Sequence, residues 1–217
     1  MTTRLVVGAC LAGALLLSRP VSGQLMPMGD DRPVLQVRAH SARGIVDDYL
    51  GDAAEVAYLL LRQAGIDSEW QLCGQDGCQD GSARSAPIVV ILQAGPDAAR
   101  PNACGRAAHG SEEGRGTVRI WVPCVEDVAR RLAQLVETKV HPLLGLQTHA
   151  DLTGAAVAHE IGHLLGLRHG GGLMRERLDR SSILALREGR LAFATHDAAA
   201  MRRTLLLLDR RAVLARR

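Results

Sequence analysis

Three histidines, a glutamate and a methionine lie close together in residues 158–174, AHEIGHLLGLRHGGGLM. His159 and His163 are four residues apart, so in an α-helix they lie on one face, about 6 Å apart along the axis. Two imidazoles at this spacing can reach the same metal ion, and zinc accepts histidine nitrogens at about 2.0 Å in a tetrahedron of four ligands. The spacing therefore predicts a zinc site on a helix.

A third ligand requires the helix to end soon after His163. His169 lies six residues further on, which is about 9 Å along a continuous helix and out of reach of the metal. Gly166 has no Cβ atom, so it can adopt a left-handed conformation, end the helix and turn the chain back. We therefore expect His169 to complete a site with three nitrogen ligands and a fourth position left for water, as in catalytic zinc sites.

Glu160 follows the first ligand and can swing toward the open coordination position. There it would accept a proton from a water molecule whose pKa zinc lowers toward about 7, and later pass this proton to a leaving amine. Zinc would also polarise the scissile carbonyl group. This combination of residues predicts hydrolysis, with Glu160 as general base and acid.

These five positions resemble a known family of enzymes. His159, Glu160, His163, Gly166 and His169 match the pattern H-E-x-x-H-x-x-G-x-x-H of the metzincin metalloproteases. The resemblance implies a zincin-like fold, one catalytic Zn²⁺ ion and endopeptidase activity. A longer frame, which includes an export signal and paired cysteines, also resembles a group of secreted bacterial zincin-like proteins, but only residues 158–175 are specific.

A methionine follows the motif in a context that also resembles the family. Gly172-Leu173-Met174 is similar to the Met-turn, which places a methionine beneath the metal, so the resemblance implies that Met174 supports the site. Two features depart from the pattern. The interval from His169 to Met174 is shorter than metzincins usually have, and no tyrosine follows Tyr58, so zinc itself would have to provide most of the oxyanion stabilisation.

The amino terminus has the pattern of an export signal. A basic start that includes Arg4 precedes an apolar run at residues 5–17, and small residues at 21–23 form a cleavage site. The 13 residues of that run are fewer than the roughly 20 that a spanning helix needs. We therefore expect residues 1–23 to be a signal peptide, the mature protein to begin near Gln24 in the periplasm or outside the cell, and no stable membrane insertion after cleavage.

The charge of the mature chain argues against a nucleic-acid partner. The full chain has a formal net charge of +3, and the expected signal peptide carries Arg4 and Arg19 but no acid, which leaves +1. Proteins that bind nucleic acid usually have a strongly basic face. We expect a monomer that acts on a peptide or protein substrate.

Four cysteines remain after the signal peptide: Cys73, Cys78, Cys104 and Cys124. Four allow three pairings, and an even number in an exported chain favours two disulfides. The preferred pairing joins Cys73 to Cys78 and Cys104 to Cys124. A zinc ribbon would need two close C-x-x-C pairs, which this sequence does not contain.

The periodicity of apolar residues predicts the elements that would position the site. After a loose lead-in at 24–41, we expect a helix at 42–64, strands at 66–72, 88–92 and 117–122, and a second helix from 123. A connection at 141–150 should lead to the motif helix, which Asp151 or Thr153 would cap. A last helix should begin at about 195. These elements form one α+β domain at 42–217. It would contain a small twisted mixed sheet with two packed helices, one of which carries the ligands.

The strand at 117–122 has arginine and tryptophan on its second face, which suits an edge strand that borders a cleft. An extended peptide could pair with such an edge through main-chain hydrogen bonds. Two alternatives remain: a zinc amidase that acts on cell-wall peptides, and a non-catalytic binding module stabilised by zinc. Glu160 counts against the second, since a structural site needs ligands but no base.

The remaining histidines lack ligand spacing; they are His40, His109, His141, His149 and His196.

Overall fold

The computed structural model describes residues 32–74, 78, 88–97, 99–100, 103–110, 116–136 and 145–214. The chain divides into two units, Met1–Asp31 and Arg32–Arg217. The first unit, with the expected signal peptide, lies outside the described residues. The elements of the second unit are β1 (Val34–Ser41), α1 (Asp47–Gln63), β2 (Asp67–Cys73), β3 (Ile88–Gln93), β4 (Gly105–His109), β5 (Gly116–Trp121), α2 (Val122–Val136), α3 (Gly145–Leu164), the 3-10 helix η2 (Gly172–Met174), α4 (Arg180–Arg187) and α5 (Thr195–Leu214).

The strands form one five-stranded mixed sheet in the order β2-β1-β3-β5-β4. β1 pairs in parallel with β2 and β3, and β3 pairs in parallel with β5. β4 is antiparallel to β5 and lies at one edge of the sheet. The prediction of a small mixed sheet with packed helices is confirmed.

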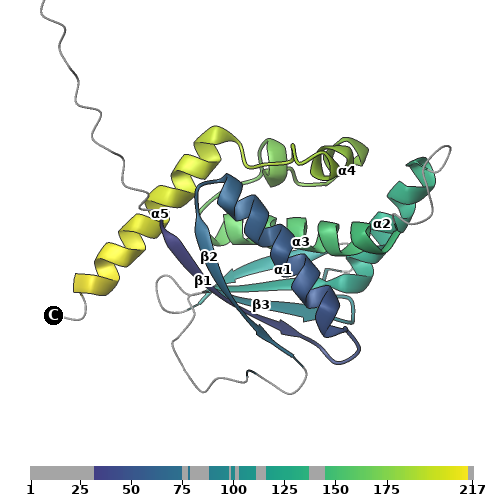
Figure 1. Ribbon diagram of the computed structural model, residues 1–217, viewed down its shortest axis with the longest axis horizontal. Coiled ribbons are helices and arrows are strands. Elements are labelled where there is room, and N and C mark those ends of the chain that lie inside the picture. Colours follow the sequence, from purple (N-terminus) through teal and green to yellow (C-terminus); the bar gives the residue numbers. More distant parts are fainter. Residues whose placement is uncertain are drawn as a thin grey trace, which may run out of the picture. The chain divides into compact units, whose positions relative to one another are not determined.

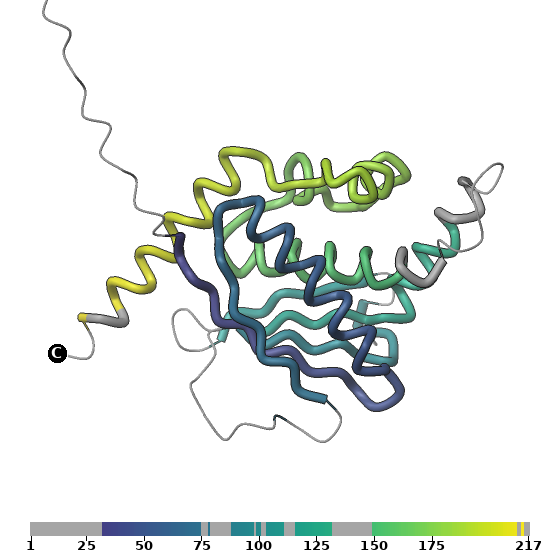
Figure 2. Tube along the Cα trace, viewed as in Figure 1, coloured from purple at the N-terminus to yellow at the C-terminus, as the bar shows by residue number. Residues whose placement is uncertain are grey.

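Helices α1 and α3 lie together on one face of the sheet, as Figures 1 and 2 show. Alternate residues of the central strands point to this face and are buried: Leu35, Val37, Ala39, Ile88, Val90, Leu92, Val118 and Ile120. The two helices approach closely at Gly154, where a Cβ atom would lie 2.5 Å from the carbonyl oxygen of Ala53. The absence of a side chain at Gly154 therefore allows the close packing of α3 on α1.

The prediction that residues 117–122 form an edge strand is wrong. β5 (Gly116–Trp121) lies between β3 and β4, and β4 forms the edge. The sequence of β4, GRAAH, is short and has no β-branched residue, so its local pattern gave no strand signal. Pairing with β5, which is a tertiary contact, makes this segment a strand.

The segment at 24–41 contains an element that the sequence analysis did not predict. Residues Val34–Ser41 form β1, which is hydrogen-bonded to strands on both sides. Leu35, Val37 and Ala39 alternate with more exposed residues, so the period of two was present. The helix expected at 42–64 begins only at Asp47, because a turn with Gly44 at φ 96° precedes it.

The motif helix begins earlier than predicted. Gly145 is its first residue, so the expected connection at 141–150 is wrong in its last six positions, and neither Asp151 nor Thr153 is a cap. Thr153 is fully buried inside the helix, and its hydroxyl lies 2.7 Å from that of Tyr49 on α1. A polar contact between helices thus occupies the residue that local sequence rules favour as a cap.

The last helix begins at Thr195, as predicted, whereas α4 was not predicted. β3 is buried on one face only, since Val89 and Ile91 are partly exposed. No helix in the described part of the chain is long and apolar enough to cross a membrane.

Candidate metal centre

Helix α3 places His159 and His163 with their rings directed at each other. Their Nε2 atoms lie 3.0 Å apart, and their ring centroids 4.7 Å apart. This is the arrangement that a spacing of four residues on one helical face predicts. His159 is 9% exposed and His163 is partly exposed, so the pair is more accessible on its C-terminal side.

The turn after α3 brings His169 to the same point. Gly166 has a φ of 91°, its N–H group donates to the carbonyl of His163, and the N–H of Leu167 donates to the carbonyl of Gly162. These two hydrogen bonds form a Schellman motif, in which a left-handed residue ends a helix. The chain then reverses, and the Nε2 atom of His169 lies 3.2 Å from that of His163.

Hydrogen bonds at the other ring nitrogen determine what the imidazoles of His159 and His163 can do. The Nδ1 atom of His159 lies 2.9 Å from the carbonyl oxygen of Leu173. The Nδ1 atom of His163 lies 2.9 Å from the carbonyl oxygen of Leu167. A carbonyl oxygen only accepts, so each Nδ1 carries the proton, and in the neutral ring the Nε2 atom keeps its lone pair.

Neutral rings with this tautomer direct two lone pairs at each other across 3.0 Å. That contact is repulsive unless a cation lies between the nitrogens. Two nitrogens bound to one tetrahedral zinc ion at about 2.0–2.1 Å are about 3.3 Å apart, close to the distances of 3.0 and 3.2 Å seen here. The three Nε2 atoms therefore fit a zinc ion, and the Nδ1 hydrogen bonds are the outer contacts that orient metal-binding histidines.

Burial favours the neutral form of the first ligand. The pKa of His159 is lowered from its usual 6.5, mainly because burial disfavours the charged ring, and the neighbouring His163 and His169 add to the lowering. The hydrogen bond to Leu173 acts in the opposite direction. A neutral imidazole is the form that binds a metal.

Glu160 lies next to the ligands, and its carboxylate contacts the edge strand. Burial raises its pKa above the usual 4.5, while the nearby His163 and a hydrogen bond from the N–H of Ala107 lower it. The carboxylate also lies against Gly105, where a Cβ atom would come within 2.6 Å of Oε1. A partly desolvated carboxylate beside three imidazoles has the environment of a general base.

Met174 lies in a tight turn underneath α3. It is fully buried, and a Cβ atom on Gly162 would lie 2.7 Å from its Sδ atom. The turn is closed by a hydrogen bond from the N–H of Gly170 to the carbonyl of Met174. Met174 thus packs beneath the helical turn between the first two histidines.

The glycine that opens this turn has a specific requirement. Gly172 has a φ of 58°, and a Cβ atom there would lie 2.4 Å from the carbonyl oxygen of Ala192. The N–H of Leu173 donates to that same carbonyl. A side chain at position 172 would therefore displace the residue whose carbonyl oxygen orients His159.

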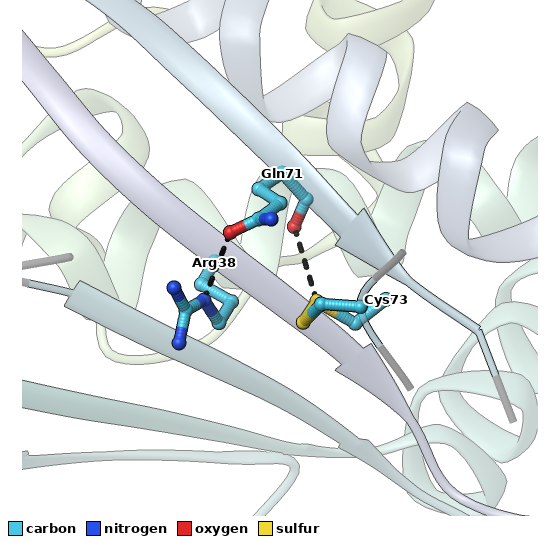
Figure 3. Close-up of a disulfide and its surroundings, with 4 residues drawn as sticks. Arg38, Gln71 and Cys73 are labelled. Carbon is cyan, nitrogen blue, oxygen red and sulfur yellow. Dashed lines mark hydrogen bonds between the residues drawn. A yellow bond between two sulfur atoms is a disulfide. The ribbon is translucent and has the colours of Figure 1, made fainter. Parts of the chain in front are cut away.

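Both cysteine pairs expected from the sequence are disulfides in the structure. Cys73 is joined to Cys78, and Cys104 to Cys124. Figure 3 shows Cys73 near Gln71, whose side-chain oxygen accepts a hydrogen bond from Arg38. The second disulfide ties the residue before β4 to the first turn of α2.

A second cluster of metal-binding residue types surrounds the first disulfide. His40, Cys73 and Cys78 have their ligand atoms within 4.8 Å of one another. The two sulfur atoms are bonded to each other, so they supply no thiolate to a metal. Within the described residues, the cluster of His159, His163 and His169 is therefore the one with free ligand atoms.

Of the remaining histidines, those in the described part of the chain do not belong to this cluster. The side chain of His196 is 82% exposed, and its Nε2 atom lies 3.2 Å from Oδ1 of Asp197; His141 lies outside the described residues. Residue patterns did not predict the contributions of β4 and of the carbonyl groups of Leu167 and Leu173. These contributions come from the backbone or from a glycine, so residue type gave no signal for them.

Comparison of the sequence with protein-family models gave no match, and comparison with curated proteins gave none either. Among solved structures, the chain is similar to the crystal structure of archaemetzincin from Methanopyrus kandleri. The similarity has a TM-score of 0.49 at 16% sequence identity, and it covers 83% of this chain and 99% of that chain.

Proposed function

We propose that this protein is a secreted zinc-dependent metalloendopeptidase, with His159, His163 and His169 as ligands and Glu160 as general base and acid. The observation that carries the proposal is the convergence of three imidazole Nε2 atoms next to the partly buried Glu160. A purely structural zinc site would need a fourth protein ligand and no base. Here the cluster among the described residues consists of three histidines, and Glu160 follows the first of them in the sequence.

A bound zinc ion would activate a water molecule and polarise the scissile carbonyl of the substrate. The protein's own residues would do the rest. Glu160, whose pKa burial raises, would accept the proton of the water and deliver it to the leaving amine. Leu167 and Leu173 would hold the first two ligands in one tautomer through their carbonyl groups.

The proposed substrate is an extended peptide that pairs with the edge strand β4. The outer edge of β4 borders the metal centre, since Ala107 donates to Glu160 and α3 packs against both β4 and β5. A peptide adding to an edge strand gains main-chain hydrogen bonds whatever its side chains. A flexible or unfolded segment is the form of substrate that can pair in this way.

Export is proposed from the amino-terminal pattern together with the cysteines. All four cysteines after the signal are paired in disulfides, as is usual for exported proteins and unusual in the cytosol. Sequencing the amino terminus of the protein recovered from its native host would test export, with cleavage near Gln24 as the expected result.

The experiment that tests the activity is mass spectrometry of a diverse peptide library incubated with the zinc-loaded protein. We expect cleavage by the wild type and a rate at least about 100-fold lower for Glu160→Ala, the usual scale for loss of a general base. Zinc content is measured in parallel, because the variant should keep its metal. Zinc binding without cleavage of any peptide would overturn the endopeptidase proposal and favour an amidase or a binding module.

Zinc binding itself needs a separate control. His159→Ala and His163→Ala should each lose zinc on dialysis against a weak chelator, whereas His196→Ala should retain it, since that side chain is 82% exposed. Retention of stoichiometric zinc by both ligand variants would contradict the assignment of the metal centre.

A further inference from the structure

The edge strand β4 directs alternate backbone groups outward from the sheet. The N–H of Trp121 donates to the carbonyl of Cys104, so these two residues form a hydrogen-bonded pair. In antiparallel strands such pairs alternate with pairs whose backbone groups point away from the partner. Continuing the register, Arg106 and Ala108 bond to β5, whereas Gly105, Ala107 and His109 present their N–H and C=O groups outward.

The outward N–H of Ala107 faces the carboxylate of Glu160 and lowers its pKa. An edge strand usually offers such a group to solvent or to another chain. Here the side chain of the proposed general base occupies it. A hydrogen bond between the two groups would fix the carboxylate relative to β4, and not only relative to α3.

Gly105 provides the space that this position of the carboxylate needs. A Cβ atom at residue 105 would lie 2.6 Å from Oε1, 2.9 Å from Cγ and 3.0 Å from Cδ of Glu160. Real Cβ atoms do not approach other atoms so closely, so a side chain at 105 would have to displace the carboxylate. The atoms that it meets are at the end of a flexible side chain, so the protein could still fold while Glu160 moves.

The backbone at residue 105 is held from its N-terminal side. Cys104 is bonded to Cys124 in the first turn of α2, and its carbonyl accepts from Trp121. Trp121 is 4% exposed, which places this anchor in the core. The strand therefore cannot easily move away from Glu160, and displacement of the carboxylate is the remaining response to a larger residue at 105.

We propose that Gly105 and the N–H of Ala107 form a carboxylate seat on the edge strand, and that Gly105 is a positioning residue for the reaction. The seat sets where the carboxylate of Glu160 lies relative to the three Nε2 atoms. This inference rests on the proposed function for its catalytic part. The hydrogen bond at Ala107 can be tested in the metal-free protein.

The test compares Gly105→Ala with Gly116→Ala. Position 116 lies on the neighbouring strand opposite His109, and a Cβ atom there would lie 2.6 Å from Cδ1 of Leu164. The two variants thus add the same methyl group with equally close contacts, but only Gly105→Ala meets Glu160. Glu160→Ala is the third variant, because it removes the acceptor without changing β4.

Two measurements are made on each variant. The first is hydrogen exchange of the Ala107 amide in metal-free protein, which needs no activity. We expect exchange to accelerate at least about tenfold in Gly105→Ala and Glu160→Ala but not in Gly116→Ala. The second is peptide cleavage by the zinc-loaded protein. Gly105→Ala should lower kcat by about 10- to 100-fold, which is the usual effect of misplacing a catalytic group by about 1 Å. Its KM and its zinc affinity should stay within about threefold of the wild-type values.

The results of the two measurements distinguish the carboxylate seat from its positioning role. If Ala107 exchanges at the wild-type rate in Gly105→Ala and Glu160→Ala, the carboxylate seat is overturned, even if the wild type cleaves peptides. If exchange accelerates but kcat is unchanged, or if Gly116→Ala lowers kcat equally, the positioning role is overturned. If the wild type cleaves no peptide while exchange behaves as expected, the seat stands as a structural feature, and the proposed function and the positioning role fail together. Should Gly105→Ala not fold, Glu160→Ala still decides the hydrogen bond.

Discussion

The Nδ1–H of His159, on helix α3, donates to the carbonyl oxygen of Leu173, in the turn η2, across 2.9 Å. The residue that follows Leu173 is Met174, whose sulfur packs against Gly162 one turn along the same helix. The turn therefore contacts α3 twice, once through a hydrogen bond that orients a ligand and once through packing. This arrangement predicts that the turn aims His159 and that Met174 keeps the turn in place.

We predict that Met174→Ala destabilises the protein by about 2–5 kcal/mol, the usual cost of truncating a buried methionine. It should also weaken zinc binding, because the carbonyl of Leu173 would shift. Met174→Leu nearly conserves volume and should cost less than about 1.5 kcal/mol with zinc affinity close to wild type. Urea denaturation and competition with a zinc chelator measure both effects; equal zinc affinity in Met174→Ala and wild type would contradict a supporting role for this residue.

Gly166→Ala should lower zinc affinity through backbone strain alone. Gly166 has a φ of 91° and no atom within 4 Å of the position of an added Cβ. Gly44, with a φ of 96°, has equally open surroundings in the turn before α1. Both alanine variants should lose about 1–2 kcal/mol of stability. Only Gly166→Ala should also weaken zinc binding, because it displaces His169, and equal zinc affinities would show that His169 is not a ligand.

The metal-free protein should lose stability as the pH falls below the pKa of unfolded histidine. Burial lowers the pKa of His159 from 6.5 in the folded state, so the unfolded chain binds a proton that the folded one does not. The contribution of His159 is thus fully present above pH 6.5 and is lost as the pH falls from there toward its folded pKa. Glu160, whose pKa is raised from 4.5, acts with the opposite sign.

His159→Asn isolates this effect, because asparagine can still donate to Leu173 but does not titrate. Between about pH 7.5 and about pH 5.5, urea denaturation in the presence of a chelator should show a steeper loss of stability for the wild type than for the variant. His40 also has a lowered pKa, and it is unchanged in the variant, so its contribution cancels. Parallel pH dependences for the two proteins would contradict the lowered pKa of His159.

The two disulfides should differ in their effect on stability and on the site. Their sequence separations are 20 for Cys104–Cys124 and 5 for Cys73–Cys78. Loop-closure entropy predicts losses of about 3 and about 2 kcal/mol, respectively, when each pair is replaced by alanine. The double variant Cys104→Ala/Cys124→Ala should also lower kcat for peptide cleavage, because this disulfide anchors β4 next to Glu160. Unchanged kcat in that variant would show that the carboxylate seat does not need this anchor.

Local patterns predicted a good part of this fold. Alternation and helical periodicity located β2, β3, β5, α1 and α2 approximately, together with the start of α5. They failed for β4, whose sequence GRAAH has no strand propensity, and for the start of α3, where buried Thr153 bonds to Tyr49 on another helix. In both places a contact between segments distant in sequence outweighed a local preference.

The sequence by itself determined the chemistry of the site: a spacing of four puts two histidines on one helical face, and Gly166 allows the turn that returns His169. It also determined that the cysteines can form two disulfides. Only the tertiary structure decided that β4 is an edge strand, that the carbonyl of Leu173 meets the ring of His159, and that Gly105 lies against the side chain of Glu160. The physical reason is that backbone N–H and C=O groups are common to almost every residue, so their partners are set by how distant segments pack and not by residue type.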